Sequence, residues 1–265
     1  MNEAAQTVLV VDDLVAGYGD VTILDGVSLE VARGEIAVVL GGSGSGKSTL
    51  LRCIVGLLRP RRGRVLIDGR DVHASHGPAR EEILRHVGMS FQSAALLNSM
   101  SVAENVALPI VEHWRLDLET ALMMARMRLG RVGLAAAGDK MPAELSGGMR
   151  KRAGLARAMA LEPSLLLCDE PSAGLDPITG RELDELILDL AREGNMAIVV
   201  VTHELGSINA IADRAIMLAD GRVLASGTLD EVRANPHPIV QAFFQRRTLD
   251  GHDVRRLDVL LESPR

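Results

Sequence analysis

Short apolar runs separated by polar turns recur along the first third of the chain. They cover residues 8–11, 27–31, 36–40, 65–67 and 87–91. Apolar runs of this length that end at polar residues favour β-strands. From about residue 93 to 160 the apolar positions instead recur at the spacing of an amphipathic helix. The pattern therefore predicts a strand-rich beginning followed by a helical region.

Strands and helices alternate after residue 160. The continuous apolar runs 165–168 and 197–202 are typical of strands that are buried on both faces of a parallel sheet. Between them, residues 178–192 place a row of leucines and Ile187 on one helical face. Asp220-Gly221 stands between two further apolar runs and predicts a hairpin. Such alternation is typical of an α/β fold.

Composition narrows the function classes. The chain has 265 residues, of which 47% are hydrophobic and 2% aromatic, and its formal net charge is −6. The core must therefore be aliphatic, and the mild acidity argues against a nucleic-acid-binding protein. No apolar run reaches the roughly 18 residues that a membrane-spanning helix needs. Cys53 and Cys168 are isolated, so we expect buried apolar side chains in a reducing compartment and no disulfide.

A glycine-rich loop follows the apolar run 36–40 and precedes an apolar helix expected at 50–58. Its sequence fits G-x-x-x-x-G-K-[ST], the pattern of a phosphate-binding loop. Loop N–H groups and the N-terminus of the following helix attract phosphate oxygens. The lysine supplies a charge to the β- and γ-phosphates, and the hydroxyl after it is a ligand for Mg²⁺. We therefore expect ATP and Mg²⁺ to bind at Gly41, Gly42, Ser43, Gly44, Ser45, Gly46, Lys47, Ser48 and Thr49.

Two carboxylates end the apolar run 165–168. The carboxyl ends of parallel strands meet at one edge of the sheet, so Asp169 and Glu170 should lie close to the phosphate loop. Asp169 is then a candidate ligand for Mg²⁺, directly or through water. Glu170 is the candidate general base that polarises the water attacking the γ-phosphate.

A second candidate anion site is formed by Ser146, Gly147 and Gly148, which precede a helix expected at 150–160. With its flanking residues Leu145 and Met149, this segment resembles the signature sequence of ATP-binding subunits of ABC transporters. The resemblance covers roughly residues 8–230. It implies a P-loop ATPase fold with a mostly parallel core sheet, an N-terminal antiparallel part and an inserted helical subdomain at about 93–160. It also implies a head-to-tail homodimer, in which each ATP lies between one chain's phosphate loop and the other chain's signature.

Four further positions match the same family pattern. Tyr18 resembles the aromatic residue that stacks on adenine, and Gln92 the glutamine that contacts Mg²⁺ and couples the site to the membrane partner. Asp176 belongs to a segment resembling the loop that crosses to the partner chain. His203 resembles the switch histidine that hydrogen-bonds the γ-phosphate. The resemblance thus implies catalytic roles for Lys47, Gln92, Glu170 and His203.

A narrower branch is indicated by Met149, where the commonest family version has Gln, together with 89–96 and 176–179. These segments are similar to those of MCE-associated lipid transporters, including the Mla phospholipid system of Gram-negative bacteria. This implies phospholipid transport between inner and outer membrane, with permease, MCE-domain and small accessory subunits as partners and no nucleic acid. It also implies a location at the cytoplasmic face of the bacterial inner membrane.

Other interpretations remain open at this stage. They are an importer of small polar solutes such as amino acids, a non-transport ABC ATPase, and a small-molecule kinase. We expect an ATPase domain at 6–235 and a C-terminal tail at 236–265. Apolar residues in the tail predict a short docking helix, formed around Ile239, Val240, Phe243 and Phe244.

Overall fold

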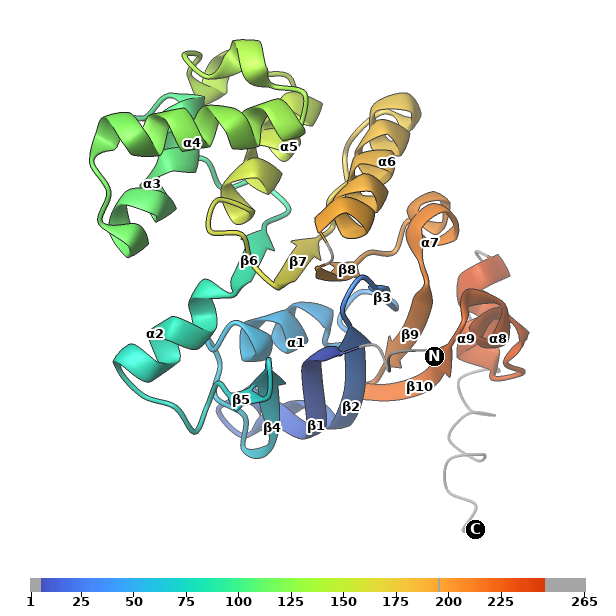
Figure 1. Ribbon diagram of the computed structural model, residues 1–265. Helices are drawn as coiled ribbons and strands as arrows, with labels where there is room; N and C mark the ends of the chain where they lie inside the picture. Colours follow the sequence, from blue (N-terminus) through green and yellow to red (C-terminus); the bar gives the residue numbers. More distant parts are fainter. Residues whose placement is uncertain (1–5, 195, 246–265) are drawn as a thin grey trace, which may run out of the picture.

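The computed structural model describes residues 6–194 and 196–245. An antiparallel sheet built from N-terminal strands lies in the lower part of the view in Figure 1. Its strand order is β2-β1-β4-β5, and consecutive strands β1 and β2 form its first pairing. The strands are β1 (Thr7–Tyr18), β2 (Val21–Ala32), β4 (Arg62–Ile67) and β5 (Arg70–Asp71).

A second, mostly parallel sheet forms the centre, with the order β10-β9-β3-β8-β7-β6. All its neighbouring pairs are parallel except β9 and β10, which form the predicted antiparallel hairpin. Asp220 and Gly221 have φ values of 47° and 75°, which suit a tight hairpin turn. The strands are β3 (Ile36–Leu40), β6 (Val87–Ser90), β7 (Leu165–Asp169), β8 (Ala197–Val201), β9 (Arg214–Ala219) and β10 (Arg222–Gly227).

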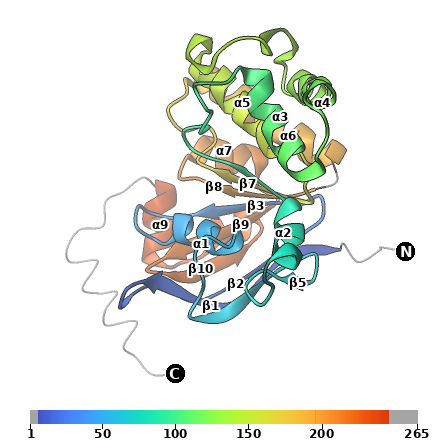
Figure 2. The same cartoon turned by 90° about the vertical axis from the view of Figure 1, so that its left-hand side faces the viewer.

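The central sheet is buried on both faces, as its continuous apolar runs predict. Alternate residues of β3 point to opposite sides: Val38 packs with the helices of one layer, and Val39 with the antiparallel sheet and the helix α1 (Lys47–Ile54). Figure 2 shows the resulting layers, with the central sheet between a helical region and the antiparallel sheet. Both faces are therefore dry, and polar chemistry is confined to the ends of the strands.

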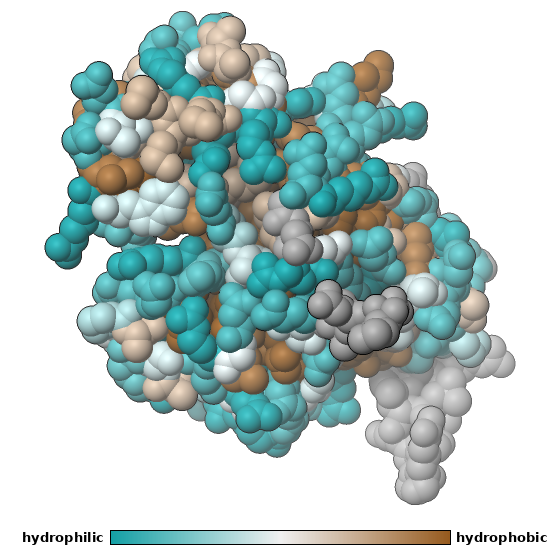
Figure 3. All heavy atoms as spheres, in the orientation of Figure 1, coloured by the Kyte–Doolittle hydropathy of each residue, from teal (hydrophilic) through white to brown (hydrophobic). Residues whose placement is uncertain are grey.

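The helical region contains α3 (Val102–Trp114), α4 (Leu118–Arg131) and α5 (Gly147–Ala158). Ser101 caps α3 in a reciprocal capping box with Glu104. Apolar side chains interrupt the polar surface over this region (Figure 3), and exposed ones on α4 include Met123 and Met127. Two short 3₁₀ turns, Ala135–Ala137 and Pro142–Glu144, connect α4 to α5.

The remaining helices flank the two sheets. The predicted helix at 178–192 is α6 (Pro177–Gly194), and the predicted tail helix is α9 (Pro238–Gln245). Val240 of α9 is fully buried in the core of its own chain, so this helix packs in cis. The part of the tail beyond residue 245 lies outside the described residues. The other helices are α2 (Pro78–Arg85), α7 (Leu205–Ile211) and α8 (Leu229–Ala234).

Three sequence-based boundaries were wrong. The apolar helix expected to reach residue 58 ends at Ile54 instead, because the chain turns at Gly56 with a φ of 73°. Similarly, Phe91 lies beyond β6, which ends at Ser90. In the opposite direction, α5 begins at Gly147, since Ser146 provides its N-cap.

Candidate functional site

The carboxyl ends of four adjacent central strands border one cavity of about 590 Å³. Lys47 follows β3, His203 follows β8, Glu170 follows β7 and Gln92 follows β6. Every residue of the predicted phosphate loop except Ser45 lines the cavity. Tyr18 and Asp169 line it as well. The fold therefore brings the loop, the acid pair, the glutamine and the histidine of the sequence analysis to one place.

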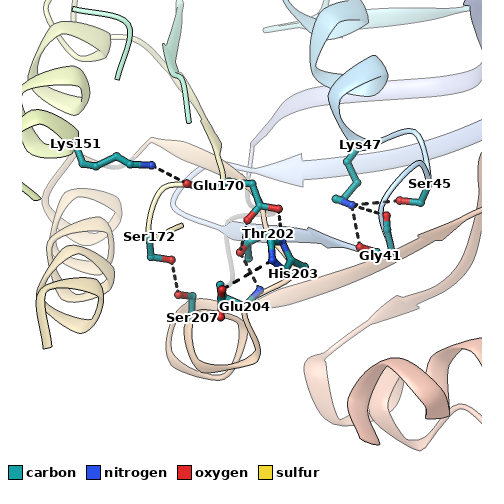
Figure 4. A network of polar contacts seen from close by, with 11 residues as sticks. Gly41, Ser45, Lys47, Lys151, Glu170, Ser172, Thr202, His203, Glu204 and Ser207 are labelled. Atoms are coloured by element: carbon teal, nitrogen blue, oxygen red, sulfur yellow. Dashed lines mark hydrogen bonds and ion pairs between the residues drawn. The ribbon is translucent and has the colours of Figure 1, made fainter. Parts of the chain in front are cut away.

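The phosphate loop is closed on itself by Lys47. Its Nζ donates hydrogen bonds to the carbonyl oxygens of Gly41 and Gly42, both at 2.8 Å, and lies 3.4 Å from Oγ of Ser45 (Figure 4). Burial lowers the pKa of the Lys47 ammonium, while the nearby charges of Glu170 and Asp169 act to raise it. The ammonium is thus held at the loop by carbonyl oxygens that a phosphate could replace.

Glycine is required where the loop begins. At Gly41, where φ is 154°, an added Cβ would lie 2.1 Å from the carbonyl oxygen of Leu218. Gly42 has open space around the same position. Gly41 therefore allows the loop to pack against β9, whereas a side chain at Gly42 would meet no neighbouring atom.

Glu170 has a positive φ of 47°, a backbone conformation that residues other than glycine rarely adopt. Its N–H donates to the carbonyl oxygen of Val201 at 2.8 Å. One carboxylate oxygen, Oε2, accepts from Oγ1 of Thr202 at 3.1 Å, and the other, Oε1, lies 2.6 Å from Nδ1 of His203. Its side chain is 12% exposed, so Thr202 and His203, the two residues that follow β8, fix the direction of a nearly buried carboxylate.

Asp169 combines burial with a neighbouring negative charge. Burial and then Glu170 raise the pKa of its carboxyl, against the lowering effect of Lys47, Lys151 and Arg52. The hydroxyl of Ser48 and the amide of Gln92 line the same cavity. These are the hard oxygen donors that Mg²⁺ prefers, and they are few enough to leave room for water and phosphate oxygens. The residues therefore fit Mg²⁺, although no cluster of three His, Cys, Asp or Glu side chains suited to a metal occurs among the described residues.

Tyr18 lies at the apolar end of the cavity, at the last residue of β1, and is 44% exposed. Its hydroxyl accepts a hydrogen bond of 2.6 Å from Nη1 of Arg52, whose guanidinium carbon is 6.0 Å from the ring centroid. Ile23 and Phe243 also line the cavity. Sequence analysis placed Phe243 only in the tail helix; the scarcity of aromatic residues was the one signal that could have directed attention to it.

The signature segment does not line this cavity. Ser146 caps α5 by accepting a hydrogen bond of 3.2 Å from the N–H of Met149, and both Ser146 and Gly147 are exposed. Asp176 is also elsewhere: its Oδ1 accepts from the N–H groups of Ile178 and Thr179, both at 3.1 Å. Within one chain, then, Ser146, Gly147, Gly148 and Asp176 are not brought to the phosphate loop.

Both cysteines are free and fully buried, in agreement with the sequence analysis. Burial raises the pKa of Cys53 to about 11 and that of Cys168 to about 12, so neither thiol ionises readily. Among the described residues, none of the helices combines the length and apolar character needed to cross a membrane.

Comparison with known proteins identifies the family. Residues 24–173 match the model of the ABC transporter family. The intermembrane phospholipid transport system ATP-binding protein MlaF of Escherichia coli K12 is 41% identical over 251 residues, which are 95% of this chain and 91% of that protein. The probable ribonucleotide transport ATP-binding protein mkl of Mycobacterium tuberculosis H37Rv is 37% identical over 239 residues, covering 90% of this chain and 67% of that protein.

A solved structure gives the same result. The ATP-binding cassette MJ0796, a dimer in a post-hydrolysis state bound to ADP and Pi, superposes with a TM-score of 0.74 at 31% identity. The match covers 83% of this chain and 98% of that one. The chain therefore belongs to the ABC transporter family, as an ATP-binding subunit that hydrolyses ATP in a process coupled to transport.

Proposed function

We propose that this chain drives phospholipid transport between the inner and outer membranes of a bacterium, in a transporter of the Mla type. The observation that carries this proposal is the 41% identity to MlaF over 95% of the chain. The Mla-like segments at 89–96 and 176–179 support the same branch. The chain then works at the cytoplasmic face of the inner membrane, bound to a permease, with MCE-domain and small accessory subunits and without nucleic acid.

ATP binds in the cavity with its phosphates at the loop and its adenine at the apolar end. Residues 41–49 offer their N–H groups and the N-terminus of α1 to the phosphates, and Lys47 exchanges its carbonyl partners for phosphate oxygens. Tyr18 provides the ring on which adenine stacks. Because the phosphates are neutralised locally, an acidic chain can bind a polyanion.

Ser48, Gln92 and Asp169 would hold Mg²⁺ in this cavity. When bound, the ion supplies positive charge that offsets the negative charge developing on the transferred phosphoryl group. Burial and the neighbouring Glu170 raise the pKa of Asp169, and a bound cation would act in the opposite direction by favouring the charged carboxylate.

Glu170 orients the attacking water and accepts its proton. Thr202 and His203 hold the two carboxylate oxygens and so fix where the proton is received. His203 is also exposed to the cavity, where its remaining nitrogen can reach the γ-phosphate. Catalysis by positioning and charge neutralisation is what phosphoryl transfer requires.

The second half of each site comes from a partner chain. Ser146, Gly147 and Gly148 form a helix N-terminus outside the cavity, where Ser146 and Gly147 are exposed, and this suits an anion carried by another molecule. Asp176 immediately precedes α6 and is exposed, so its segment can contact that partner. The dimer of the related cassette MJ0796 with ADP and Pi supports this arrangement. Closure of the homodimer on ATP and its reopening after hydrolysis then change the surface around Gln92 that faces the permease.

This cycle reaches the membrane through the helical subdomain at about 93–160, within an ATPase domain at 6–235. Phe91 and Leu97, which flank Gln92 in sequence, are 39% and 44% exposed and offer apolar surface to a helix of the permease. By this proposal the tail at 236–265 is a separate segment, whose described helix α9 docks on its own chain through Val240.

A small polar solute is the second candidate cargo. The 37% identity to mkl, whose name refers to ribonucleotide transport, favours it. The two cargoes are distinguished by reconstituting the transporter in vesicles and measuring which ligand stimulates ATP hydrolysis. Phospholipid transport requires stimulation by labelled phospholipid delivered to the transporter; stimulation by ribonucleotides alone would replace it with the second candidate.

The ATPase mechanism is tested by Glu170→Gln. This variant should bind ATP and dimerise but turn over at least about a hundredfold more slowly, because the amide cannot accept the proton. Glu162→Gln is a matched control, since Glu162 also has a positive φ of 54° but pairs with Arg128 outside the cavity. Turnover by Glu170→Gln at the wild-type rate would remove Glu170 from its role.

A further inference from the structure

The backbone at Glu170 is also contacted by the helical region of the same chain. Lys151 lies on α5, one turn after Gly147 of the signature. Its Nζ donates a hydrogen bond of 3.0 Å to the backbone carbonyl oxygen of Glu170 (Figure 4). The contact joins the helical region to the end of β7 within one chain, across 19 residues of sequence.

The ammonium group of Lys151 is buried, which costs solvation free energy. Lys151 is 8% exposed, and it lies among Ser90, Leu155, Pro171, Leu183 and Ile187. Burying a cation costs free energy unless the protein provides partners for it. Its hydrogen-bond partner is the backbone carbonyl oxygen of Glu170, so the bond depends on the backbone conformation at Glu170.

That backbone conformation is the unusual one at Glu170. A positive φ is unfavourable for glutamate and persists only where the surroundings enforce it. The N–H is fixed by Val201 of β8 and the carboxylate by Thr202 and His203. The carbonyl oxygen accepts hydrogen bonds from Nζ of Lys151 at 3.0 Å and, within the same turn, from the N–H of Ala173 at 3.2 Å. Without Lys151 the Glu170 carbonyl loses this hydrogen bond to α5, while its local bond from Ala173 and the contacts of Glu170 with Val201, Thr202 and His203 remain.

We propose that Lys151 is a positioning residue for ATP hydrolysis, which links the orientation of the signature helix α5 to the placement of Glu170 in the same chain. This rests on the proposed role of Glu170 as the base. A movement of the helical region that carries α5 away from β7 breaks the contact and releases the Glu170 peptide. ATP binding does not depend on the contact, because Lys151 does not line the nucleotide cavity.

The test compares three full-length variants for steady-state ATP hydrolysis, ATP affinity and thermal unfolding. Lys151→Met removes the donor and should lower kcat by about tenfold, the effect of losing one hydrogen bond from a charged donor, with KM and ATP affinity within about twofold. Lys151→Arg keeps a charged donor and should restore at least half of the lost kcat.

Arg152→Met is the matched control. Arg152 is the next residue of α5 and also crosses from the helical region to α6, through an ion pair of 3.0 Å with Glu182, but it does not contact Glu170. It should retain wild-type kcat. A loss of kcat in Arg152→Met equal to that in Lys151→Met would show a general packing effect and overturn the proposal.

Two further outcomes decide the proposal. Wild-type kcat in Lys151→Met refutes it even if Glu170→Gln is inactive, so its failure is distinct from a failure of the proposed base. If Lys151→Met does not fold, Lys151→Gln takes its place: its amide is polar but one bond shorter, so it should lower kcat with KM unchanged. An unchanged kcat in that variant would equally refute the role of Lys151.

Discussion

Nδ1 of His203 lies 2.6 Å from Oε1 of Glu170, a contact between the ends of the adjacent parallel strands β8 and β7. The two residues are 33 positions apart in the sequence. The contact gives His203 a role before any phosphate is present, because it fixes the carboxylate that we propose as the general base. Its proposed contact with the γ-phosphate would use the other nitrogen of the ring.

His203→Ala should lower kcat about a hundredfold while ATP binding is retained, because the Glu170 carboxylate then keeps, among the described residues, only its hydrogen bond from Thr202. Steady-state hydrolysis and equilibrium binding of a fluorescent ATP analogue measure the two effects. His113→Ala, at an exposed position on α3, should behave as wild type. Equal losses of binding and of kcat in His203→Ala would contradict this division of roles.

Tyr18→Ala should raise the Kd for ATP about tenfold, the typical contribution of one base stacked on an aromatic ring. Tyr18→Phe should bind nearly as well as wild type, although it loses the hydrogen bond from Arg52. Isothermal titration of both variants with ATP separates the ring from the hydroxyl. If Tyr18→Phe is as weak as Tyr18→Ala, the contact with Arg52 matters and stacking does not.

Gly41→Ala should lower the free energy of unfolding by about 2 kcal/mol or more, because the new Cβ cannot fit beside the Leu218 carbonyl. Gly42→Ala has open space and should change it by less than about 0.5 kcal/mol. Urea denaturation without nucleotide measures both. Similar losses in the two variants would mean that strain in the loop is not localised at Gly41.

Asp184 of α6 predicts a pH dependence of stability. It is 5% exposed, one of its oxygens has no hydrogen-bond partner, and burial raises the pKa of its carboxyl. The native state therefore binds a proton more readily than the unfolded state, so its contribution to stability falls as pH rises through the raised pKa. Asp184→Asn should raise the free energy of unfolding by about 1 kcal/mol at neutral pH.

That gain should shrink as the pH is lowered, because the wild-type carboxyl is then neutral too. Urea denaturation at mildly acidic and neutral pH measures it, with the exposed Asp189→Asn on the same helix as control. A stability difference that stays constant with pH would show that the charge of Asp184 is not responsible.

The order of elements and the members of the nucleotide site could be predicted because they depend on local patterns. A loop of glycines before Lys47, or two carboxylates after β7, are visible as continuous segments, and parallel strands bring such segments to one edge. Contacts between distant segments could not be predicted. Lys151 occurs in a basic helix without any sign that its ammonium would be buried against Glu170.

Helix ends show the same limit. The apolar pattern continues past Ile54, but the chain turns at Gly56, where an added Cβ would meet the side chain of Arg80. Phe243 was visible as an apolar helix residue, whereas its place at the nucleotide cavity depends on how α9 packs against the body of the chain. Packing of this kind is decided by tertiary structure and not by spacing.

The position of β6 in the central sheet bears on how the site could signal outward. Among the described strands, β6 forms one ladder, with β7, whereas β3, β7 and β8 each lie between two neighbours. Tilting β6 therefore shears a single set of backbone hydrogen bonds, and Gln92 at its end can shift at lower cost than Lys47, Glu170 or His203. Of the four strands that carry the site, three are therefore held rigidly on both sides. The fourth, β6, is an edge strand that can yield, and it packs against α5 of the helical region.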